Sequence, residues 1–256
     1  MTSLISSVDD GVLTIRFNRP EVFNALDEAM SAEFCTLVEG AVADERVRVV
    51  VITGTGPAFS TGADVGGAEA HEHFDVRALD RANRMIRAVV NLDKPVLAAV
   101  NGIAAGVGAS VALAADIVVA SESAGFLLAF ARIGLMPDGG STATVAASIG
   151  RARAMRMGLL GEPMSASEAY DAGLVSHLAS EADFDDTVAS LTRKLLRGAP
   201  LAQAATKRAI NAATLDGLHD ALERERTGQT LLLRTADVAE GMRAFSEKRH
   251  PVFRGE

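Results

Sequence analysis

Three segments of the sequence place small residues and a few polar side chains where they could hold and transform a ligand. Residues 58–64 (AFSTGAD) follow a predicted strand, residues 101–110 (NGIAAGVGAS) form a Gly-rich turn that opens a helix, and residues 134–140 (GLMPDGG) put the Asp138 carboxylate just before another helix. Small residues let backbone N–H groups approach a ligand closely, and a helix N-terminus favours negative charge. Two donor loops and one carboxylate fit enolate chemistry, in which amides hold an oxyanion and the carboxylate moves a proton.

Other familiar site patterns are missing from the sequence. It has no GxSxG, GxxxxGK[ST] or HExxH pattern, and Gly106 and Gly108 lack the third glycine of a dinucleotide-binding turn. His71 and His73 form an HxH pair, a possible half of a metal site, but no third ligand accompanies them. A solvated loop is therefore the favoured interpretation, and we expect no metal site. Spacing alone also leaves an ordinary helix N-cap as the simpler role for Asp138.

The composition is that of a globular protein of one or two domains, with 256 residues of which 48% are hydrophobic and 23% charged. Aromatic residues make up only 4%, and the formal net charge is -8. Both values argue against nucleic-acid binding, which uses stacking side chains and cations that face phosphate. The single Cys35 excludes an internal disulfide framework and a Cys-rich zinc site, and we expect it in the core.

Two stretches bear on where the protein resides. Residues 1–10 carry neither a basic start nor an apolar run, so we expect no secretory signal and predict a cytoplasmic location. The uncharged stretch 95–115 is long enough to cross a bilayer. It consists mostly of Ala, Gly and Val and is interrupted by Asn101, which favours a buried strand–turn–helix over a membrane span.

The first half of the chain predicts alternating strands and helices. Apolar runs or alternation predict strands over residues 11–17, 47–53, 95–100 and 117–120. Helical spacing of apolar residues predicts a helix that begins near Asp27, its N-cap, and further helices around residues 79–89 and 109–115. Residues 54–67 and 102–108, rich in small residues, are predicted as a loop and a tight turn. This alternation is typical of an α/β core.

The second half of the chain predicts almost only helices. They are expected over residues 141–150, 152–160, 167–172, 183–196, 201–213 and 217–235. Ser165 and Glu168 have capping-box spacing, and Asp237 and Glu240 repeat that spacing before a last helix. The predicted architecture is one α/β core with an appended helical segment.

The chain resembles the enoyl-CoA hydratase/isomerase (crotonase) superfamily across nearly its whole length. The matching segments are residues 18–21 (NRPE) with 24–26 (NAL), 51–65, 94–116, 134–140 and 240–249. The resemblance implies an α/β fold: a spiral of ββα units over residues 1–195 and a C-terminal helical trimerisation region over residues 196–256. It also implies homotrimers or dimers of trimers, an acyl-CoA thioester as substrate, and no cofactor other than the coenzyme A that the substrate carries.

The resemblance also assigns roles to individual residues. The backbone amides of Ala63 and Val107 would hold the thioester carbonyl oxygen between them. The other implied contacts are Val22, Phe23, Asp64 and Val65 along the adenine and pantetheine, Phe245 and Lys248 at the adenosine end, and Phe130 and Met136 in the acyl pocket. For Phe245, Phe130 and Met136 the alternative role is core packing, and for Lys248 it is a solvated helix face.

The sequence departs from the superfamily's hydratases at both of their acids. Those enzymes carry glutamates at the positions of Ser110 and Phe130, and neither residue here can transfer a proton usefully. We therefore expect double-bond hydration to be weak or absent. Val107 also replaces a glycine found in many hydratases. This change is tolerable where the local φ is negative, because the donor belongs to the backbone.

Asp138 instead matches the acid that several isomerases of the superfamily use. Residues 104–109 and 137–140 look most like the 1,2-epoxyphenylacetyl-CoA isomerase-like and the 3-enoyl to 2-enoyl-CoA isomerase-like members. We predict an acyl-CoA double-bond isomerase with Asp138 as its single acid/base. The alternatives are a hydratase with a non-standard base and a non-catalytic acyl-CoA-binding paralogue. The net charge of -8 argues against an RNA-binding member.

Overall fold

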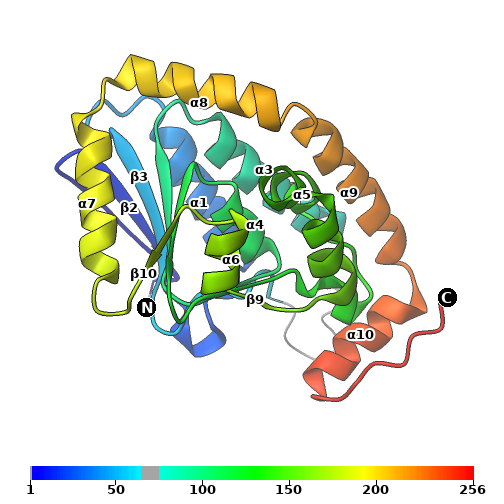
Figure 1. Ribbon diagram of the computed structural model, residues 1–256. Coiled ribbons are helices and arrows are strands. Elements are labelled where there is room, and N and C mark those ends of the chain that lie inside the picture. The colour runs from blue at the N-terminus through cyan, green and yellow to red at the C-terminus, as the bar shows by residue number, and fades with distance from the viewer. Residues whose placement is uncertain (1, 65–74) are drawn as a thin grey trace.

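The fold, given by a computed structural model that describes residues 2–64 and 75–256, is an α/β core with a helical arch over it (Figure 1). Its larger sheet has the strand order β1-β2-β3-β5-β7-β10, parallel throughout except for the β1–β2 hairpin. These strands span Leu4–Asp9 (β1), Val12–Phe17 (β2), Val49–Gly54 (β3), Val96–Val100 (β5), Ile117–Ser121 (β7) and His177–Ala179 (β10). The four strands predicted from the sequence are confirmed as β2, β3, β5 and β7.

A smaller sheet of order β4-β6-β8-β9 follows the carboxyl ends of the larger one. Its strands span Ala58–Ser60 (β4), Ile103–Ala105 (β6), Gly125–Leu127 (β8) and Met164–Ser165 (β9). Because β3, β5 and β7 run directly into β4, β6 and β8, and each pair leads to a helix, the chain forms the predicted spiral of ββα units. The prediction of only loop and turn at residues 54–67 and 102–108 was wrong, since β4 and β6 lie there. Three-residue strands of mostly small side chains are too short for alternation to reveal them.

Helices cover both faces of the larger sheet and then arch over it (Figure 1). They span Glu28–Gly40 (α1), Val76–Asn91 (α3), Val107–Leu113 (α4), Ser141–Leu160 (α5), Ala166–Ala172 (α6), Phe184–Arg197 (α7), Pro200–Thr214 (α8), Leu218–Leu232 (α9) and Ala236–Ser246 (α10), with 3₁₀ turns at Pro20–Val22 (η1) and Ala129–Ile133 (η2). In β3, Val50 and Ile52 face the main core with α1 and α3, whereas Val49 and Val51 face α7. This two-residue period explains why the strand is apolar throughout.

Most predicted helix boundaries agree with the structure. Asp27 caps α1 by accepting a hydrogen bond from the Met30 amide, and Ser165 with Glu168 forms a complete capping box on α6. The break predicted between the helices at residues 141–150 and 152–160 is confirmed, because α5 is interrupted at Gly150, whose φ of 75° and ψ of 164° are not helical. The uncharged stretch 95–115 forms the buried β5, β6 and α4. Across the described residues, no helix is long and apolar enough to span a membrane.

The predicted capping box of the last helix was wrong. Thr235 caps α10 through the Val238 amide, and Asp237 lies inside the first turn. The Asp237 carboxylate instead accepts hydrogen bonds from the backbone amides of Arg254 and Gly255. The acid that looked like a cap in the sequence therefore ties down the C-terminal segment.

Helix α10 folds back onto η2 of its own chain at the lower edge of the core (Figure 1). Gly241 makes the approach possible, because a Cβ there would lie 2.5 Å from the backbone carbonyl carbon of Ile133. On the η2 side, a Cβ on Gly134 would lie 3.0 Å from the backbone of Asp237. Two glycines thus set the distance between the terminal helix and the segment that leads to Asp138.

We predict that Gly241→Ala destabilises the protein and Gly40→Ala does not. Both glycines are helical, and alanine favours a helix by up to about 1 kcal/mol. A Cβ at position 40 meets nothing within 4 Å, whereas at position 241 it meets backbone. Overpacking costs about 1–3 kcal/mol, so Gly241→Ala should lower the unfolding temperature by a few degrees in a circular-dichroism melt. Equal melting temperatures for the two variants would contradict this account of the helix contact.

Candidate active site

The three segments singled out in the sequence converge on one cavity of about 310 Å³. Its wall is formed mostly by apolar side chains from α3, β6, α4, β8 and η2. The Asp138 carboxyl group lies between these apolar side chains. The lining residues are Thr61, Ala63, Ala78, Ala82, Ile103, Ala105, Gly106, Val107, Leu127, Ala129, Phe130, Arg132, Ile133, Leu135, Asp138 and Phe245. An acid in an apolar cavity beside backbone donors is the arrangement that enolate chemistry needs.

The two predicted donor loops lie against each other. A Cβ on Gly62 would be 3.1 Å from the Val107 nitrogen, so only a glycine at position 62 lets the loops approach this closely. Within the described part of the chain, neither the Ala63 nor the Val107 amide has a hydrogen-bond acceptor. Val107 is the first residue of α4 and does not have a positive φ, so the valine fits here as well as a glycine would. Both amides are therefore free of any acceptor in the described part of the chain and can donate to a ligand.

The motif around Asn24 holds the first donor loop in place. Asn24 is fully buried, and its amide group donates to the backbone oxygens of Ala58 and Thr55. Two residues later, the Leu26 amide donates to the Gly62 oxygen over 2.7 Å. The neighbours of Ala63 are therefore bonded on both sides, which fixes the direction of its free amide.

The backbone of Asp138 is fixed by two serines. Its carbonyl oxygen accepts hydrogen bonds of 2.8 Å from the hydroxyls of both Ser110 and Ser141. Gly139 and Gly140 follow with φ angles of 62° and 73°, and this left-handed turn swings the chain into α5. Ser110 thus bonds the main chain and leaves the Asp138 side chain to the cavity.

The Asp138 side chain is only 6% exposed. Gln229 of α9 donates a hydrogen bond from Nε2 to Oδ2 over 3.1 Å, while Oδ1 has no partner among the described residues. The pKa of Asp138 is raised to about 7, mainly because burial disfavours the charged form. The hydrogen bond from Gln229 lowers this pKa, and the charge of Glu225 raises it further. A carboxyl group with this pKa can both accept and return a proton near neutral pH.

Asp138 is not the N-cap of the following helix, which was the simpler sequence interpretation. Glu225, from α9, fills that role. Its carboxylate accepts the backbone amides of Gly140 and Thr142 over 2.7 and 3.0 Å, and the Thr142 hydroxyl as well. The Glu225 side chain is buried, and burial raises its pKa although these hydrogen bonds oppose the rise. The cap of α5 therefore comes from a helix more than 80 residues further along the chain.

Glu225 and Gln229 were both missed by the sequence reasoning. The signal was present, because Leu218, Leu222, Glu225 and Gln229 fall on one face of a helix at spacings of four, three and four. Polar residues in such an apolar stripe need buried partners.

The predicted coenzyme A contacts line an exposed rim at the donor loop. Val22 is 37% and Phe23 52% exposed, and Phe23 takes up a left-handed φ of 53°. Asp64 forms an ion pair of 3.0 Å with Arg19. Val65 lies outside the described residues, as do His71 and His73. The described members of this group are exposed, and the Thr61 amide donates to the Phe23 oxygen, so they lie beside the donor loop and outside the core.

The remaining predicted contacts divide. Phe130 and Phe245 both line the cavity, Phe130 buried and Phe245 61% exposed, so α10 of the same chain reaches the site. Lys248 lies just past the end of α10, is exposed, and has a φ of 54°. Met136 does not line this cavity: its sulfur lies 2.4 Å from where a Cβ on Gly228 would be, so it packs against α9 instead.

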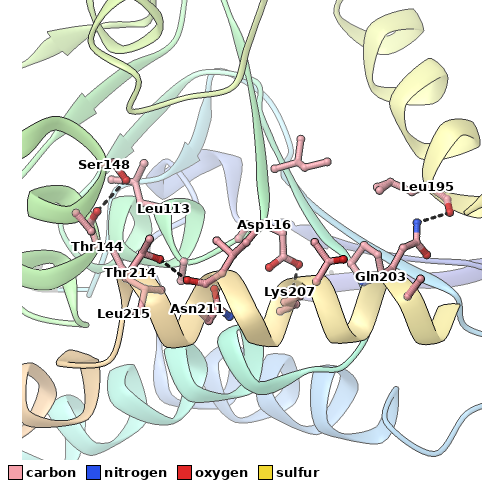
Figure 2. A pocket seen from close by; sticks show the side chains of 18 of the residues that line it. Leu113, Asp116, Thr144, Ser148, Leu195, Gln203, Lys207, Asn211, Thr214 and Leu215 are labelled. Carbon is pink, nitrogen blue, oxygen red and sulfur yellow. Dashed lines mark hydrogen bonds and ion pairs between the residues drawn. The ribbon is translucent and has the colours of Figure 1, made fainter. Parts of the chain in front are cut away.

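A second hollow, of about 580 Å³, lies beneath α8 (Figure 2). Its charged groups, Lys207 and Asp116, form an ion pair of 2.9 Å with each other. The polar side chains that Figure 2 labels bond within their own surroundings, such as Gln203 to the backbone oxygen of Leu195 over 2.8 Å. This hollow thus offers no free acid or base, and the chemistry is assigned to the Asp138 cavity.

Comparison with known proteins gives one consistent result. The family model described as enoyl-CoA hydratase/isomerase matches residues 7–256. The 1,2-epoxyphenylacetyl-CoA isomerase and the 2,3-dehydroadipyl-CoA hydratase of Escherichia coli K12 are each 36% identical to the chain, and each match covers 100% of both chains. The crystal structure of an enoyl-CoA hydratase from Mycobacterium avium subsp. paratuberculosis superimposes with a TM-score of 0.93 at 44% identity, over 99% of each chain. The predicted resemblance and fold are confirmed.

We predict that Asp138→Asn makes the protein more stable above pH 7. Asp138 ionises near pH 4 in the unfolded chain and near pH 7 in the folded one. Between these values the folded state binds more protons, so the free energy of unfolding falls as the pH rises. The variant lacks this penalty. Its melting temperature should exceed that of the wild type by a margin that grows from pH 4 to pH 7 and then stays level, and a margin independent of pH would contradict the raised pKa.

Proposed function

Because the chain belongs to the enoyl-CoA hydratase/isomerase family, we propose that it is an acyl-CoA double-bond isomerase that converts 3-enoyl to 2-enoyl thioesters. The observation that carries this choice is the set of acids at the cavity. Asp138 is buried with one oxygen that has no partner among the described residues, while Ser110 and Phe130 stand where the superfamily resemblance implies the two hydratase glutamates. A shift of the double bond needs one proton-transfer group, whereas addition of water needs a positioned water and normally two acids.

The reaction is a proton transfer in two steps. The Asp138 carboxylate removes a proton from C2, and the C–H electron pair moves into the thioester to give a dienolate with its charge on oxygen. The same carboxyl group then returns the proton at C4, and the double bond ends between C2 and C3. Atoms and electrons balance without an oxidant, reductant or added group, so the proposed chemistry needs no cofactor.

The backbone amides of Ala63 and Val107 would stabilise the dienolate oxygen. Loss of one such donor costs about 3–4 kcal/mol in comparable enzymes. Their contribution is large because the cavity wall is apolar and the amides are held in place before the substrate arrives. The raised pKa of Asp138 also makes its carboxylate a stronger base, which reduces the difference between its pKa and that of the C2–H group.

We further propose that the coenzyme A moiety of the substrate lies along Val22, Phe23 and Asp64 at the exposed rim, with its adenosine end at Phe245 of α10 and at Lys248 just past that helix. Exposed large apolar side chains beside a cavity suit the pantetheine and adenine. Lys248 supplies a cation near the phosphates despite the acidic net charge, whereas the adjacent Arg249 is already paired with Glu240 and Glu247. The superfamily resemblance adds a trimeric assembly to this proposal.

The activity is tested with 3-enoyl-CoA by the absorbance of the conjugated 2-enoyl thioester. The wild type should convert the substrate, and Asp138→Asn should lower kcat at least about 100-fold, the usual loss for a general acid/base. Asp171→Asn, a matched change at an exposed aspartate of α6, should leave kcat unchanged.

The same absorbance with 2-enoyl-CoA as substrate distinguishes the rivals. Rapid hydration that survives Asp138→Asn would show a hydratase with another base. Tight binding of both thioesters with turnover of neither would show a binding protein. Either result contradicts the isomerase.

We predict that kcat/KM for 3-enoyl-CoA rises with pH and levels off above about pH 7, because only ionised Asp138 can accept the C2 proton. Below that midpoint kcat/KM should fall about tenfold for each pH unit. The profile is measured from pH 5 to 9 at low substrate concentration. A midpoint near pH 4, the ordinary value for an aspartate, would show that burial does not tune this group.

A further inference from the structure

We propose that Gln229 is the positioning residue of this isomerisation, because it holds Oδ2 of Asp138 and so reserves Oδ1 for the substrate. The inference rests on the proposed function, since it assigns a partner to the group that moves the proton. Gln229 lies on α9, some 90 residues from Asp138 in the sequence, and its side chain is fully buried. None of the motifs that carry the resemblance includes it.

The orientation of the Gln229 amide follows from its two partners. The Met136 backbone N–H lies 3.2 Å from Oε1, and an N–H group can only donate. Oε1 must therefore face Met136, and the amide nitrogen Nε2 must face Asp138, where it donates to Oδ2 over 3.1 Å. Both ends of the amide are used by the same loop. Gln229 thus fixes the loop backbone and the carboxyl group together.

Asp138 needs this contact because no other hydrogen bond from the described residues fixes the plane of its carboxyl group. Ser110 and Ser141 bond only its main-chain oxygen, and the terminal torsion of an aspartate is broad. With Oδ2 held by Gln229, Oδ1 is the oxygen left without a partner among the described residues. One atom would then remove the proton at C2 and return it at C4, so both transfers occur on the same face of the acyl group.

Two further charged side chains belong to the elements around the cavity, Glu225 and Arg132. Glu225 lies one helical turn before Gln229 on α9, and its charge favours the neutral form of Asp138. Arg132 of η2 lines the same cavity and is itself exposed. The hydrogen bond from Gln229 opposes the effect of Glu225, because it favours the ionised form of Asp138, which is the form that accepts a proton.

The first test is Gln229→Met, which keeps the length of the side chain and removes both polar ends. We expect the pH midpoint of kcat/KM to rise by about one unit, because the ionised carboxyl loses its donor. We also expect kcat to fall at least tenfold at pH 9, above both midpoints, with a smaller change in KM. The matched control is Gln203→Met on α8, where the amide bonds Leu195 away from the cavity, and it should leave both the midpoint and kcat unchanged.

The second variant, Gln229→Glu, keeps the acceptor for Met136 and replaces the donor by an acid. Two carboxyl groups about 3 Å apart share a proton, so the midpoint should rise further than in Gln229→Met. This variant decides the question where Gln229→Met fails to fold. A merely structural role for Gln229 would lower the folded fraction and leave the midpoint in place. Wild-type midpoints or wild-type kcat in the folded variants overturn the proposal.

A measurement without turnover separates this proposal from the proposed function. The pKa of Asp138 can be read from the ¹³C signal of its carboxyl carbon in aspartate-labelled protein, with Asp138→Asn to assign the signal. An upward shift of about one unit in Gln229→Met supports the contact even if 3-enoyl-CoA is not converted. An unchanged pKa overturns it even if the wild type is an active isomerase.

Discussion

The structure depends on one imbalance, a buried carboxyl group that receives a single hydrogen bond from the described residues. Asp138 is almost entirely removed from solvent and gains the Gln229 amide in return. Such a group costs the fold free energy, since removal of an ion from water is not repaid by one donor. The surrounding loop is held in place by several contacts. Two serine hydroxyls donate to the Asp138 carbonyl oxygen, and two glycines with left-handed φ angles form the turn. Glu225 caps the helix that follows. The rest of the loop is fixed so that one oxygen can stay without a partner.

The two halves of the chain contribute different parts of the site. The ββα spiral supplies the amides of Ala63 and Val107 through loops that follow parallel strands, where backbone groups naturally gather at one edge. The C-terminal helices supply the side chains that tune the acid, Gln229 and Glu225 from α9, and a wall residue, Phe245 from α10. The helical arch in Figure 1 is thus part of the site as well as a cover for the core. Detachment of α9 would leave Asp138 without its partner and α5 without its cap.

What could be predicted from the sequence follows from the range over which each signal acts. The strands β2, β3, β5 and β7 and the cap at Asp27 depend on neighbours within a few residues, so periodicity and residue type reveal them. The donor loops and Asp138 were found because glycines and an acid stand out against apolar surroundings. Glu225 and Gln229 were missed because their partners lie 85 and 91 residues away, and no local pattern says which loop an amide on a helix will meet. The prediction that Asp237 caps the last helix was wrong for the same reason. Its carboxylate bonds the C-terminal segment, and Thr235 is the N-cap of α10.

The acid set, and not overall similarity, carries the assignment of the reaction. An isomerase and a hydratase from the same bacterium are each 36% identical to the chain over its full length, so identity cannot choose between their chemistries. In the proposed reaction the thioester oxygen is held by backbone amides, and a backbone donor is retained when the side chain changes, as at Val107, which begins α4. Whether isomerisation or hydration follows then depends on which carbons of the substrate lie next to an acidic side chain. At this cavity Ser110 is bonded to the main chain and Phe130 forms part of the wall. The acid among the described lining residues is therefore Asp138, whose Oδ2 accepts a hydrogen bond from Gln229 of α9.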